Sequence, residues 1–246
     1  MNLSNNKVLI TGGGSGIGLE MAKRFLAAKS EVTVTGRSEA KLKAACDANP
    51  GMNYAVCDIT NDDHLKALAS DIEAKGGVNV LVNCAGIFNE VNYRDESASL
   101  EEQMQEVDID FAGPIRTTHH FLPILKKQKN AALVNVSSGL AFVPISVAPV
   151  YCATKAGIHS WTRSLRNQIE SQVKVFELMP PLTKTPMIKD EWDKFKPIPV
   201  AALVDGFAKG FEKNKYEICV GQSKQLRMMS KRAPKFIFKA LNKSFS

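Results

Sequence analysis

The sequence predicts an α/β fold: one doubly wound, parallel β-sheet with helices on both faces. Short apolar runs rich in β-branched residues alternate along the chain with longer segments of helical pattern. The short runs do not alternate strictly between polar and apolar residues, which is typical of parallel strands buried on both faces. A glycine-rich turn, TGGGSGIG at residues 11–18, joins the first run to the first helical segment. Together these observations indicate strands joined by crossover helices in a single domain.

The predicted strands and helices account for most of the chain. The seven strands cover residues 7–11, 31–36, 52–57, 79–83, 132–137, 174–179 and 216–221. The six helices cover residues 16–28, 39–48, 62–75, 100–127, 150–171 and 201–213. Such a Rossmann-like sheet binds ligands at the carboxyl ends of its strands, where the strand order reverses. We expect one domain over residues 1–221, followed by a tail over 222–246 that belongs to it or forms an interaction segment.

The composition is that of a globular domain without metal or disulfide chemistry. With 246 residues, 44% of them hydrophobic, the chain can fill one core. No apolar run reaches membrane-spanning length, and the polar residues 1–6 lack the apolar centre of a signal peptide, so we expect a cytoplasmic protein. The five cysteines form no CxxC pair and the four histidines no HExxH arrangement, so we expect no metal site.

Positive charge is concentrated at the carboxyl end of the chain. The net charge is +7. Residues 222–246 contain seven cations and no acidic residue. The remaining 25 of the 32 basic residues balance the 25 acidic residues, so we expect no nucleic-acid-binding surface on the body of the protein. The seven cations of the tail are Lys224, Arg227, Lys231, Arg232, Lys235, Lys239 and Lys243.

The glycine-rich turn has a physical reason if it binds a dinucleotide. Gly12 permits a tight exit from the strand, Gly16 lets backbone amides approach a pyrophosphate, and Gly18 lets the helix pack closely on the sheet. The N-terminus of the helix then faces the anion. Glycine also collects in flexible loops, but the strand–turn–helix setting favours a nucleotide site.

The end of the second predicted strand indicates which dinucleotide is bound. An NAD-binding sheet usually carries an acid here for the ribose hydroxyls, whereas this strand ends Thr35-Gly36-Arg37. No carboxylate would repel a 2'-phosphate, and a guanidinium suits one. We therefore favour NADP(H), with NAD(H) as the alternative if Arg37 only caps the turn or stacks on adenine.

A tyrosine and a lysine four residues apart form the candidate catalytic pair. In a helix this spacing puts Tyr151 and Lys155 on one face. The cation would lower the pKa of the phenol, which could then act as a general acid or base at neutral pH. A YxxxK pair alone is also common on protein surfaces. Here, however, the ends of three predicted strands add Asp58, Asn83 and Ser138 at the same edge of the sheet.

These motifs resemble those of the classical short-chain dehydrogenases/reductases. The sequence matches the TGxxxGxG turn, the Asp after the third strand, the NNAG motif as NCAG at residues 83–86, the active-site serine and YxxxK. It also matches the proline after the sixth strand with its following threonine. The glycine turn, the Gly36-Arg37 turn and the tail from Arg232 to Asn242 further resemble the DltE-like branch of that family.

The resemblance implies an oxidoreductase that transfers a hydride between NADP(H) and a carbonyl or secondary alcohol substrate. It implies that Ser138 polarises the substrate oxygen, Tyr151 exchanges the proton, and Lys155 lowers the tyrosine pKa and holds the nicotinamide ribose. It also implies a homodimer or homotetramer formed through the helices at 100–127 and 150–171. The residues it places around the cofactor are Thr11, Gly12, Ser15, Gly16, Ile17, Gly18, Arg37, Asp58, Ile59, Asn83, Ala85, Gly86, Tyr151, Lys155, Pro180 and Thr185.

Two positions depart from the family pattern. Asp110 stands where the family often has an Asn that helps hold a water on the proton path from the lysine. An ionised Asp110 would favour the lysine cation but disfavour a tyrosinate; alternatively, its side chain keeps a helix kink, as Asn would. Pro181 replaces the usual glycine, which stiffens the loop after Pro180 and removes an amide donor, while Thr185 stays available to the nicotinamide carboxamide.

Apolar residues near the predicted site favour an at least partly apolar substrate, although the same residues could be loop packing. They are residues 142–145 and 147–149, together with Met179, Met187 and Trp192 in the segment expected to cover the site.

A short helix is expected after Pro234 in the tail. The basic and apolar composition of the tail suits peripheral contact with an anionic membrane, or packing on its own subunit or a neighbour. A nucleotide-binding regulator with little turnover is the alternative function.

Overall fold

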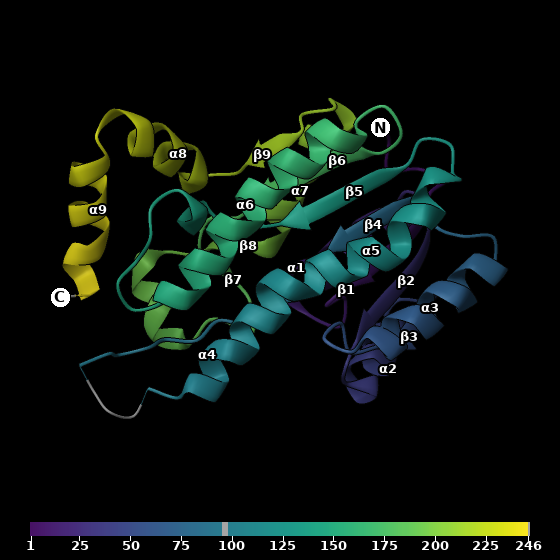
Figure 1. The fold of residues 1–246 in the computed structure, drawn as a ribbon, viewed down its shortest axis with the longest axis horizontal. Helices are drawn as coiled ribbons and strands as arrows, with labels where there is room; N and C mark the ends of the chain where they lie inside the picture. Colours follow the sequence, from purple (N-terminus) through teal and green to yellow (C-terminus); the bar gives the residue numbers. More distant parts are fainter. Residues whose placement is uncertain (95–97, 246) are drawn as a thin grey trace.

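The central element is a sheet of seven parallel strands in the order β3-β2-β1-β4-β5-β6-β9 (Figure 1). This computed structural model describes residues 1–94 and 98–245. The strand order reverses at the neighbours β1 and β4, because β2 and β3 lie on the far side of β1. The α/β class and the seven predicted strands are confirmed. The strands are β1 (Lys7–Thr11), β2 (Glu31–Gly36), β3 (Met52–Val56), β4 (Val80–Asn83), β5 (Ala132–Val136), β6 (Lys174–Met179) and β9 (Glu217–Cys219).

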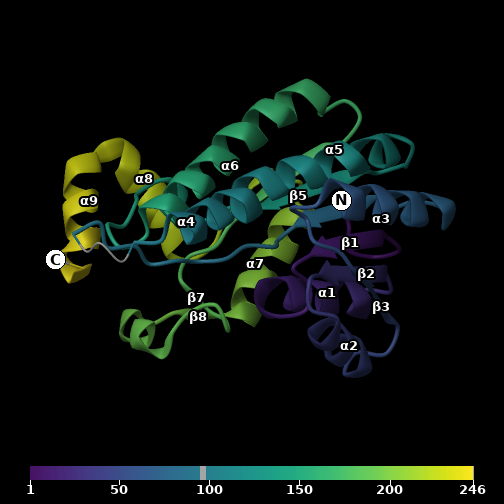
Figure 2. The same ribbon diagram turned by 60° about the horizontal axis from the view of Figure 1, so that its bottom comes forward.

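Helices cover both faces of the sheet (Figures 1 and 2). They include α1 (Gly16–Ala27), α2 (Glu39–Asp47), α3 (Asp62–Ala74), α5 (Gly113–Lys126), α6 (Pro149–Ile169) and α7 (Val200–Glu212). On one face α1 and α7 meet through Phe25, whose ring contacts Phe207 and Phe211 edge to face at 6.2 and 6.0 Å. On the other face α3 and α5 bury Leu65 and Phe121 in a second core. The two cores hold the sheet rigid, so that its carboxyl edge can position a site.

The segment predicted as one helix over residues 100–127 is interrupted in the structure. α4 (Leu100–Val107) passes into a π-helical segment, η1 (Asp108–Ala112), and then into α5. Pro114 has no N–H group to donate to the carbonyl of Asp110 four residues earlier, so regular α-helical bonding cannot continue there. The prediction of one continuous helix was wrong at this point. The interrupted turn carries Asp110 into the interior, where it is 1% exposed.

A small second pair of strands stands apart from the main sheet. β7 (Thr183–Lys184) and β8 (Ile198–Pro199) run parallel to each other. The chain between them forms the short helix η3 (Asp190–Phe195), in which Trp192 is buried. This excursion follows β6 directly and therefore starts at the carboxyl edge of the sheet.

The tail folds into two further helices at one outer edge of the molecule, as both views show (Figures 1 and 2). They are α8 (Gln222–Arg232) and α9 (Pro234–Asn242), followed by the short η4 (Lys243–Phe245). α8 packs against η2 (Gly139–Ala141), the turn that follows β5. The helix expected after Pro234 is present, whereas α8 was not predicted. None of the helices in the described ranges is both long and apolar enough to cross a membrane.

Candidate active site

One cavity of about 550 Å³ runs along the carboxyl ends of the strands. It starts at the glycine turn after β1, passes the point of strand reversal and ends under η3 and the tail. Most residues that the sequence predicts for the site line this single space. They are Gly12, Ser15, Gly16, Ile17, Gly18, Arg37, Asp58, Ile59, Ala85, Gly86, Asp110, Ser138, Tyr151, Lys155, Pro180 and Thr185.

Thr11 and Asn83 lie behind the cavity wall and do not line it. The hydroxyl oxygen of Thr11 accepts hydrogen bonds from the backbone N–H groups of Cys84 and Ala85, at 3.1 and 3.2 Å. The side-chain amide of Asn83 donates to the side chain of Asn135 at 2.9 Å. Both side chains are buried. They therefore fix the turn after β4, and that turn, with Ala85, forms the wall itself.

The glycine turn fits a pyrophosphate because it leaves no room for side chains. Gly12 has a φ of +68°, and a Cβ atom there would lie 2.7 Å from the Cα of Ala85. A Cβ on Gly18 would lie 2.5 Å from the carbonyl oxygen of Gly12. In the described chain Ser15 makes no side-chain capping bond, and the first turn of α1 contains no acidic residue. The first N–H groups of α1 are therefore free to bind an anion.

Arg37 and Asp58 line the cavity at the ends of β2 and β3. Arg37 is exposed and forms no ion pair with any described residue. One carboxylate oxygen of Asp58 accepts hydrogen bonds from the N–H and hydroxyl groups of Thr60, at 2.9 and 2.8 Å. Burial raises the pKa of Asp58, but the bonds from Thr60 and the nearby Arg37 outweigh burial and lower it below its usual range. This end of the cavity therefore offers one guanidinium and one carboxylate to a ligand.

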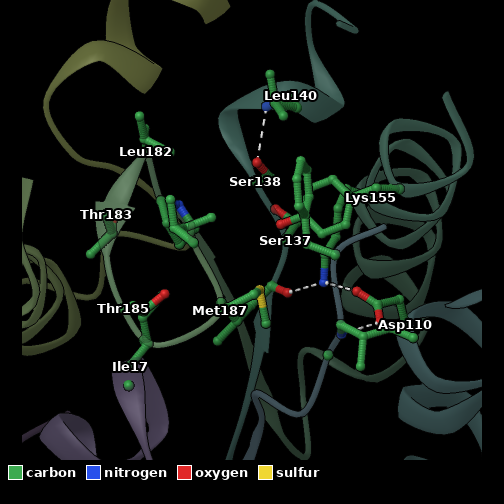
Figure 3. A pocket seen from close by; sticks show the side chains of 18 of the residues that line it. Ile17, Asp110, Ser137, Ser138, Leu140, Lys155, Leu182, Thr183, Thr185 and Met187 are labelled. Carbon is green, nitrogen blue, oxygen red and sulfur yellow. Dashed lines mark hydrogen bonds and ion pairs between the residues drawn. The ribbon is translucent and has the colours of Figure 1, made fainter. Parts of the chain in front are cut away.

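Ser138, Lys155 and Asp110 converge on the opposite end of the cavity (Figure 3). The hydroxyl oxygen of Ser138 accepts the backbone N–H of Leu140 at 3.1 Å, which leaves its hydrogen available to donate. Lys155, 6% exposed, holds its Nζ 3.0 Å from Oδ2 of Asp110. The same Nζ lies 5.3 Å from the ring centroid of Tyr151, one turn earlier on α6. A hydroxyl, a phenol and an ammonium thus surround one small volume, as proton transfer to a ligand requires.

The charges around Tyr151 favour its protonated form. Burial raises the pKa of Tyr151 and Asp110 raises it further, against the opposing effects of Lys155 and of the hydrogen bond from Ser138. Burial lowers the pKa of Lys155, but Asp110 and Tyr151 outweigh burial and raise it above its usual value. Burial also raises the pKa of Asp110, against the lowering effects of Lys155 and of the hydrogen bond from Ile87. At neutral pH the site therefore holds a protonated lysine beside a neutral phenol.

Asp110 uses both carboxylate oxygens outside its own helix. Oδ1 accepts the backbone N–H of Ile87 at 2.8 Å, and Oδ2 faces Lys155. A side chain that held the helix kink would bond to its own helical backbone. Of the two roles that the sequence leaves open, the observed side-chain contacts agree with the pairing to the lysine, and none of them is to the backbone of its own helix. The irregular helix is explained by Pro114 instead.

The tail helices form a wall of the cavity that the sequence reasoning missed. Leu226 of α8, Leu241 of α9 and Phe245 all line the cavity. The ring of Phe245 lies 5.4 Å from that of Trp192 and 5.3 Å from that of Phe195. The sequence shows the apolar residues of the tail, and their spacing predicts which face of a helix is apolar. The spacing does not predict which part of the protein that face packs against.

Two contacts anchor the tail beside the candidate serine. The side chain of Asn242 accepts the N–H of Ser146 at 2.6 Å and donates to the carbonyl oxygen of Pro144 at 3.0 Å. Gly139 follows Ser138 directly, and a Cβ there would lie 2.6 Å from Oγ of Ser223. The tail therefore packs on its own subunit, at the position where β5 ends.

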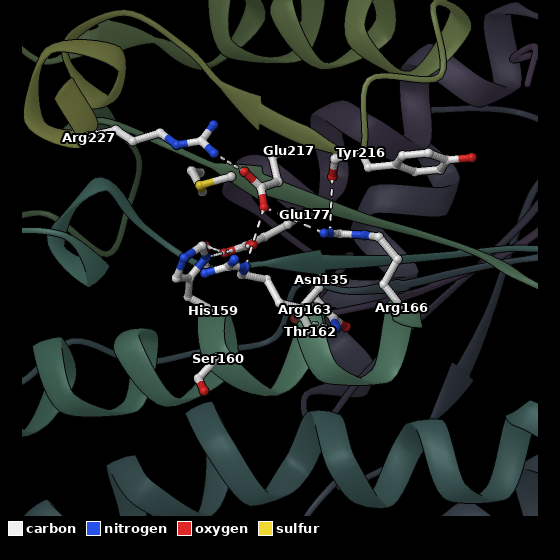
Figure 4. A network of polar contacts seen from close by, with 12 residues as sticks. Asn135, His159, Ser160, Thr162, Arg163, Arg166, Glu177, Tyr216, Glu217 and Arg227 are labelled. Atoms are coloured by element: carbon white, nitrogen blue, oxygen red, sulfur yellow. Dashed lines mark hydrogen bonds and ion pairs between the residues drawn. The ribbon is translucent and has the colours of Figure 1, made fainter. Parts of the chain in front are cut away.

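A buried polar layer supports the site from behind (Figure 4). Glu177 of β6 is fully buried; it accepts the hydroxyl of Ser137 at 2.5 Å and lies 2.9 Å from Nδ1 of His159 on α6. Glu217 of β9 pairs with Arg227 of α8. These bonds tie the end of β5 to α6 and to the tail. Ser138, which follows β5, and Tyr151 on α6 are therefore held in a fixed relation.

A doubly wound sheet whose cavity joins a glycine turn to a serine, a tyrosine and a lysine defines a dinucleotide-dependent oxidoreductase. The chain belongs to the short chain dehydrogenase family, whose profile matches residues 6–196. It is 38% identical, over 248 aligned positions and 98% of each chain, to the "Uncharacterized oxidoreductase DltE" of Bacillus subtilis (strain 168). The predicted family and its DltE-like branch are confirmed, and with them an oxidoreductase of the dehydrogenase/reductase class.

Solved structures share this fold over nearly the whole chain. A short chain dehydrogenase from Burkholderia cenocepacia J2315, in complex with NADP, superposes with a TM-score of 0.85 at 22% identity, covering 98% of this chain and 99% of that one. A 3-ketoacyl-(acyl-carrier-protein) reductase from Brucella melitensis, complexed with NADH, gives 0.81 at 24% identity, covering 90% and 100%. Because these two neighbours hold different nicotinamide cofactors, a cofactor preference must be argued from the residues of this chain.

Proposed function

We propose that this protein is an NADP(H)-dependent carbonyl reductase, reversible as an alcohol dehydrogenase, with Tyr151 as proton donor and acceptor. The proposal is carried by one observation: the serine, tyrosine and lysine share a single cavity with a glycine turn open to an anion. When bound, the nicotinamide cofactor supplies the hydride. Ser138 donates a hydrogen bond to the carbonyl oxygen and Tyr151 gives that oxygen its proton, while Lys155 stabilises the remaining phenolate.

The protonation state of Tyr151 supports reduction as the favoured direction. A reductase needs a neutral phenol that can donate a proton, whereas oxidation of an alcohol by the same site needs a phenolate that can accept one. The pKa of Tyr151 is raised by burial and by Asp110. The phenol is therefore in its donating form at neutral pH, and oxidation of an alcohol requires a more alkaline solution.

The cofactor preference rests on Arg37. Gly12, Ser15 and Ile17 would hold the phosphates, and Arg37 at the end of β2 would bind the 2'-phosphate that only NADP(H) carries. Titration with NADPH and NADH, followed by nicotinamide fluorescence, tests this. Arg37→Asp should weaken NADPH binding about tenfold or more, since it removes charged hydrogen bonds and adds repulsion, and should leave NADH binding near wild type. Tighter binding of NADH by the wild-type protein would overturn the role of Arg37.

The substrate end of the cavity supports a neutral, mostly apolar carbonyl compound. Its walls are hydrophobic and aromatic, and among the described residues that line this end the only ionisable acid and base are Asp110 and Lys155, which pair with each other. An anionic or phosphorylated substrate would need a cation at this end. The apolar walls are formed by Phe88, Leu140, Ile145, Leu182, Met187, Ile188, Trp192, Phe195, Leu226, Leu241 and Phe245.

The catalytic test is Tyr151→Phe, assayed with NADPH and a panel of apolar aldehydes and ketones. Removing the phenol hydroxyl should lower kcat at least about 100-fold, because it removes the proton donor, and should leave NADPH binding intact. Turnover retained by the variant would contradict the assignment of the proton donor. A wild-type protein that binds NADPH tightly but reduces no carbonyl compound would favour the alternative function, a nucleotide-binding regulator.

We propose a homodimer or homotetramer formed through α4, α5 and α6. The described surface of α4 exposes Leu100 and Met104, one turn apart, with 72% and 55% of their surface accessible. Exposed apolar side chains grouped on one helix are typical of a subunit interface.

A cytoplasmic location is proposed from the cysteines. All five are free thiols, and a reducing compartment keeps thiols in this form.

The exposed side chains of α9 support a second contact, with an anionic membrane surface. Phe236 and Phe238 are 65% and 48% exposed, and the exposed Lys235 and Lys239 lie on the same short helix. Aromatic and cationic side chains together suit the interface of a charged bilayer. Sedimentation with vesicles that contain phosphatidylglycerol tests this contact. Binding should weaken with salt and with Phe236→Ser/Phe238→Ser, and a full-length protein that stays in the supernatant would dismiss it.

A further inference from the structure

The substrate end of the cavity opens to solvent beside the tail. Ala240 of α9 and Ser244 of η4 line the cavity and are exposed, whereas Leu241 and Phe245 line it from partly buried positions. A lining residue that is also exposed marks a place where the cavity meets solvent. Phe236, 65% exposed, precedes Ala240 by one turn, so its ring and this opening lie on one side of α9. An exposed aromatic ring therefore borders the opening.

A row of exposed cations accompanies this opening at an outer edge of the molecule (Figures 1 and 2). Lys235, Lys239 and Lys243 recur at intervals of four residues, and all three are exposed. Lys239 and Lys243 directly precede the lining residues Ala240 and Ser244. None of the three lysines pairs with an acidic residue in the part of the chain that the structure describes. Cations without counter-charges, beside exposed aromatic rings, match the phosphate groups and the apolar interior of an anionic lipid surface.

We propose that the enzyme takes its substrate from an anionic membrane: α9 lies on the lipid surface, and a long-chain aldehyde or ketone dissolved in the bilayer enters beside Ala240. This inference rests on the proposed function. The carbonyl group reaches Ser138 and Tyr151, and the alkyl chain runs along the apolar wall to the opening. The reaction is that already proposed: the carbonyl compound, NADPH and one proton from solution give the alcohol and NADP⁺.

Contact with lipid is what makes such a substrate accessible. Burial of each methylene group in an apolar medium is favourable, so a long-chain carbonyl compound resides in the bilayer and hardly at all in water. A cavity that opened away from lipid would therefore meet little of it. In this protein the cations and the opening share α9 and η4, so binding to lipid brings the substrate end of the cavity to the bilayer.

The competing role of α9 is purely structural, as a cover over the apolar end of the cavity. That role depends on buried contacts, such as the two hydrogen bonds of Asn242 with the segment before α6. It does not depend on exposed ammonium groups. Lys235→Gln/Lys239→Gln therefore separates the two roles, because it removes two charges and keeps the buried contacts. Lys66→Gln/Lys209→Gln, on α3 and α7, is the matched control with the same loss of charge at exposed positions outside the tail.

The experiment compares hexadecanal, dissolved in lipid vesicles, with butanal, which dissolves in water. With NADPH, wild-type kcat/KM for hexadecanal should be about tenfold or more higher in phosphatidylglycerol vesicles than in phosphatidylcholine vesicles, and high salt should remove the difference. Neither kind of vesicle should change the kinetics with butanal. Lys235→Gln/Lys239→Gln should weaken sedimentation with phosphatidylglycerol vesicles and lower kcat/KM for hexadecanal in them about tenfold, with wild-type kinetics for butanal. The control pair should match the wild type with both aldehydes.

A second variant tests the path of the alkyl chain. Ala240→Trp adds a large side chain at the opening and leaves the cations in place. It should lower kcat/KM for hexadecanal about tenfold or more, while sedimentation with phosphatidylglycerol vesicles stays at the wild-type level. An Ala240→Trp enzyme with the wild-type kcat/KM for hexadecanal would contradict entry beside Ala240.

The outcomes distinguish this inference from the proposed function. Equal kcat/KM for hexadecanal in the two kinds of vesicle, or a wild-type value in Lys235→Gln/Lys239→Gln, overturns the membrane source of the substrate. Reduction of butanal without reduction of hexadecanal overturns it as well. A wild-type protein that reduces neither aldehyde, nor any other carbonyl compound, would instead overturn the proposed function, and sedimentation would then report the contact with lipid alone.

Discussion

Asp110 determines how much negative charge surrounds the phenol of Tyr151. An amide at this position would accept a hydrogen bond from Lys155 without neutralising it, and the cation would then act on Tyr151 at full strength. The carboxylate instead forms an ion pair with Lys155 at 3.0 Å, in a place where Asp110 itself is 1% exposed. Water screens this pair little, so its effect on Tyr151 is large for a single residue. Asp110 therefore makes the site a better proton donor than proton acceptor.

Replacing Asp110 by asparagine should move the pH dependence of both reaction directions to lower pH. Asp110 raises the pKa of Tyr151, so its removal lowers that pKa. Alcohol oxidation, which needs the phenolate, should then begin about one pH unit lower, and carbonyl reduction should lose activity about one unit lower. Profiles of kcat/KM against pH in both directions measure the change. Asp108→Asn is the control, because Asp108 pairs with Arg116 instead; an unchanged profile in Asp110→Asn would contradict the effect of Asp110 on Tyr151.

The helices α8 and α9 supply a wall that the sheet and its crossover helices do not. Phe245 packs on Trp192 and Phe195 of η3, so the tail and the excursion after β6 together close one end of the cavity. Asn242 bonds to the segment that leads into α6, and this ties the wall to the helix of Tyr151. The tail therefore shapes the substrate end and lies away from the glycine turn.

Truncating the inner face of the tail should weaken substrate binding selectively. Leu241→Ala/Phe245→Ala removes apolar wall surface, so KM for an apolar ketone should rise about tenfold, while NADPH binding stays unchanged. Phe236→Ala/Phe238→Ala is the control, because these side chains are exposed on the same helix and should leave KM at the wild-type value. Steady-state kinetics and fluorescence titration give the two quantities. A control pair that raises KM as much as the inner pair would contradict the wall.

The strands and most of the site could be predicted because the signal for each is local. A strand buried on both faces, such as Val80–Asn83, is an apolar run whatever it packs against, and the glycine turn is read from eight consecutive residues. Glu106 shows the limit. On a helix with Glu101 and Glu102 it looks like a solvated residue, and only the packing of α6 and of the segment after β4 encloses it. Burial set by distant segments leaves no pattern in the local sequence.

The whole molecule is polarised between a formally neutral body and a basic tail. The tail carries seven cations and lies at the outer edge of the subunit, near the substrate end of the cavity. Two tails would repel each other in a symmetric contact, because each presents like charges. An interface between subunits is therefore better placed on α4, whose exposed apolar pair is flanked by two like charges, Glu101 and Glu102, and not by seven.

A double substitution on α4 should dissociate the proposed oligomer without unfolding the subunit. Burying Leu100 and Met104 at an interface stabilises it by about 1.5–3 kcal/mol for each side chain, so Leu100→Lys/Met104→Lys should raise the dissociation constant about 100-fold or more. The substituted positions are exposed in the isolated chain, so circular dichroism and the midpoint of thermal unfolding of the monomer should change little. Analytical ultracentrifugation over a concentration series measures the association. Met228→Lys, which charges an exposed apolar side chain of α8, should leave association unchanged; if Met228→Lys dissociates the protein and the α4 pair does not, the interface lies on the tail.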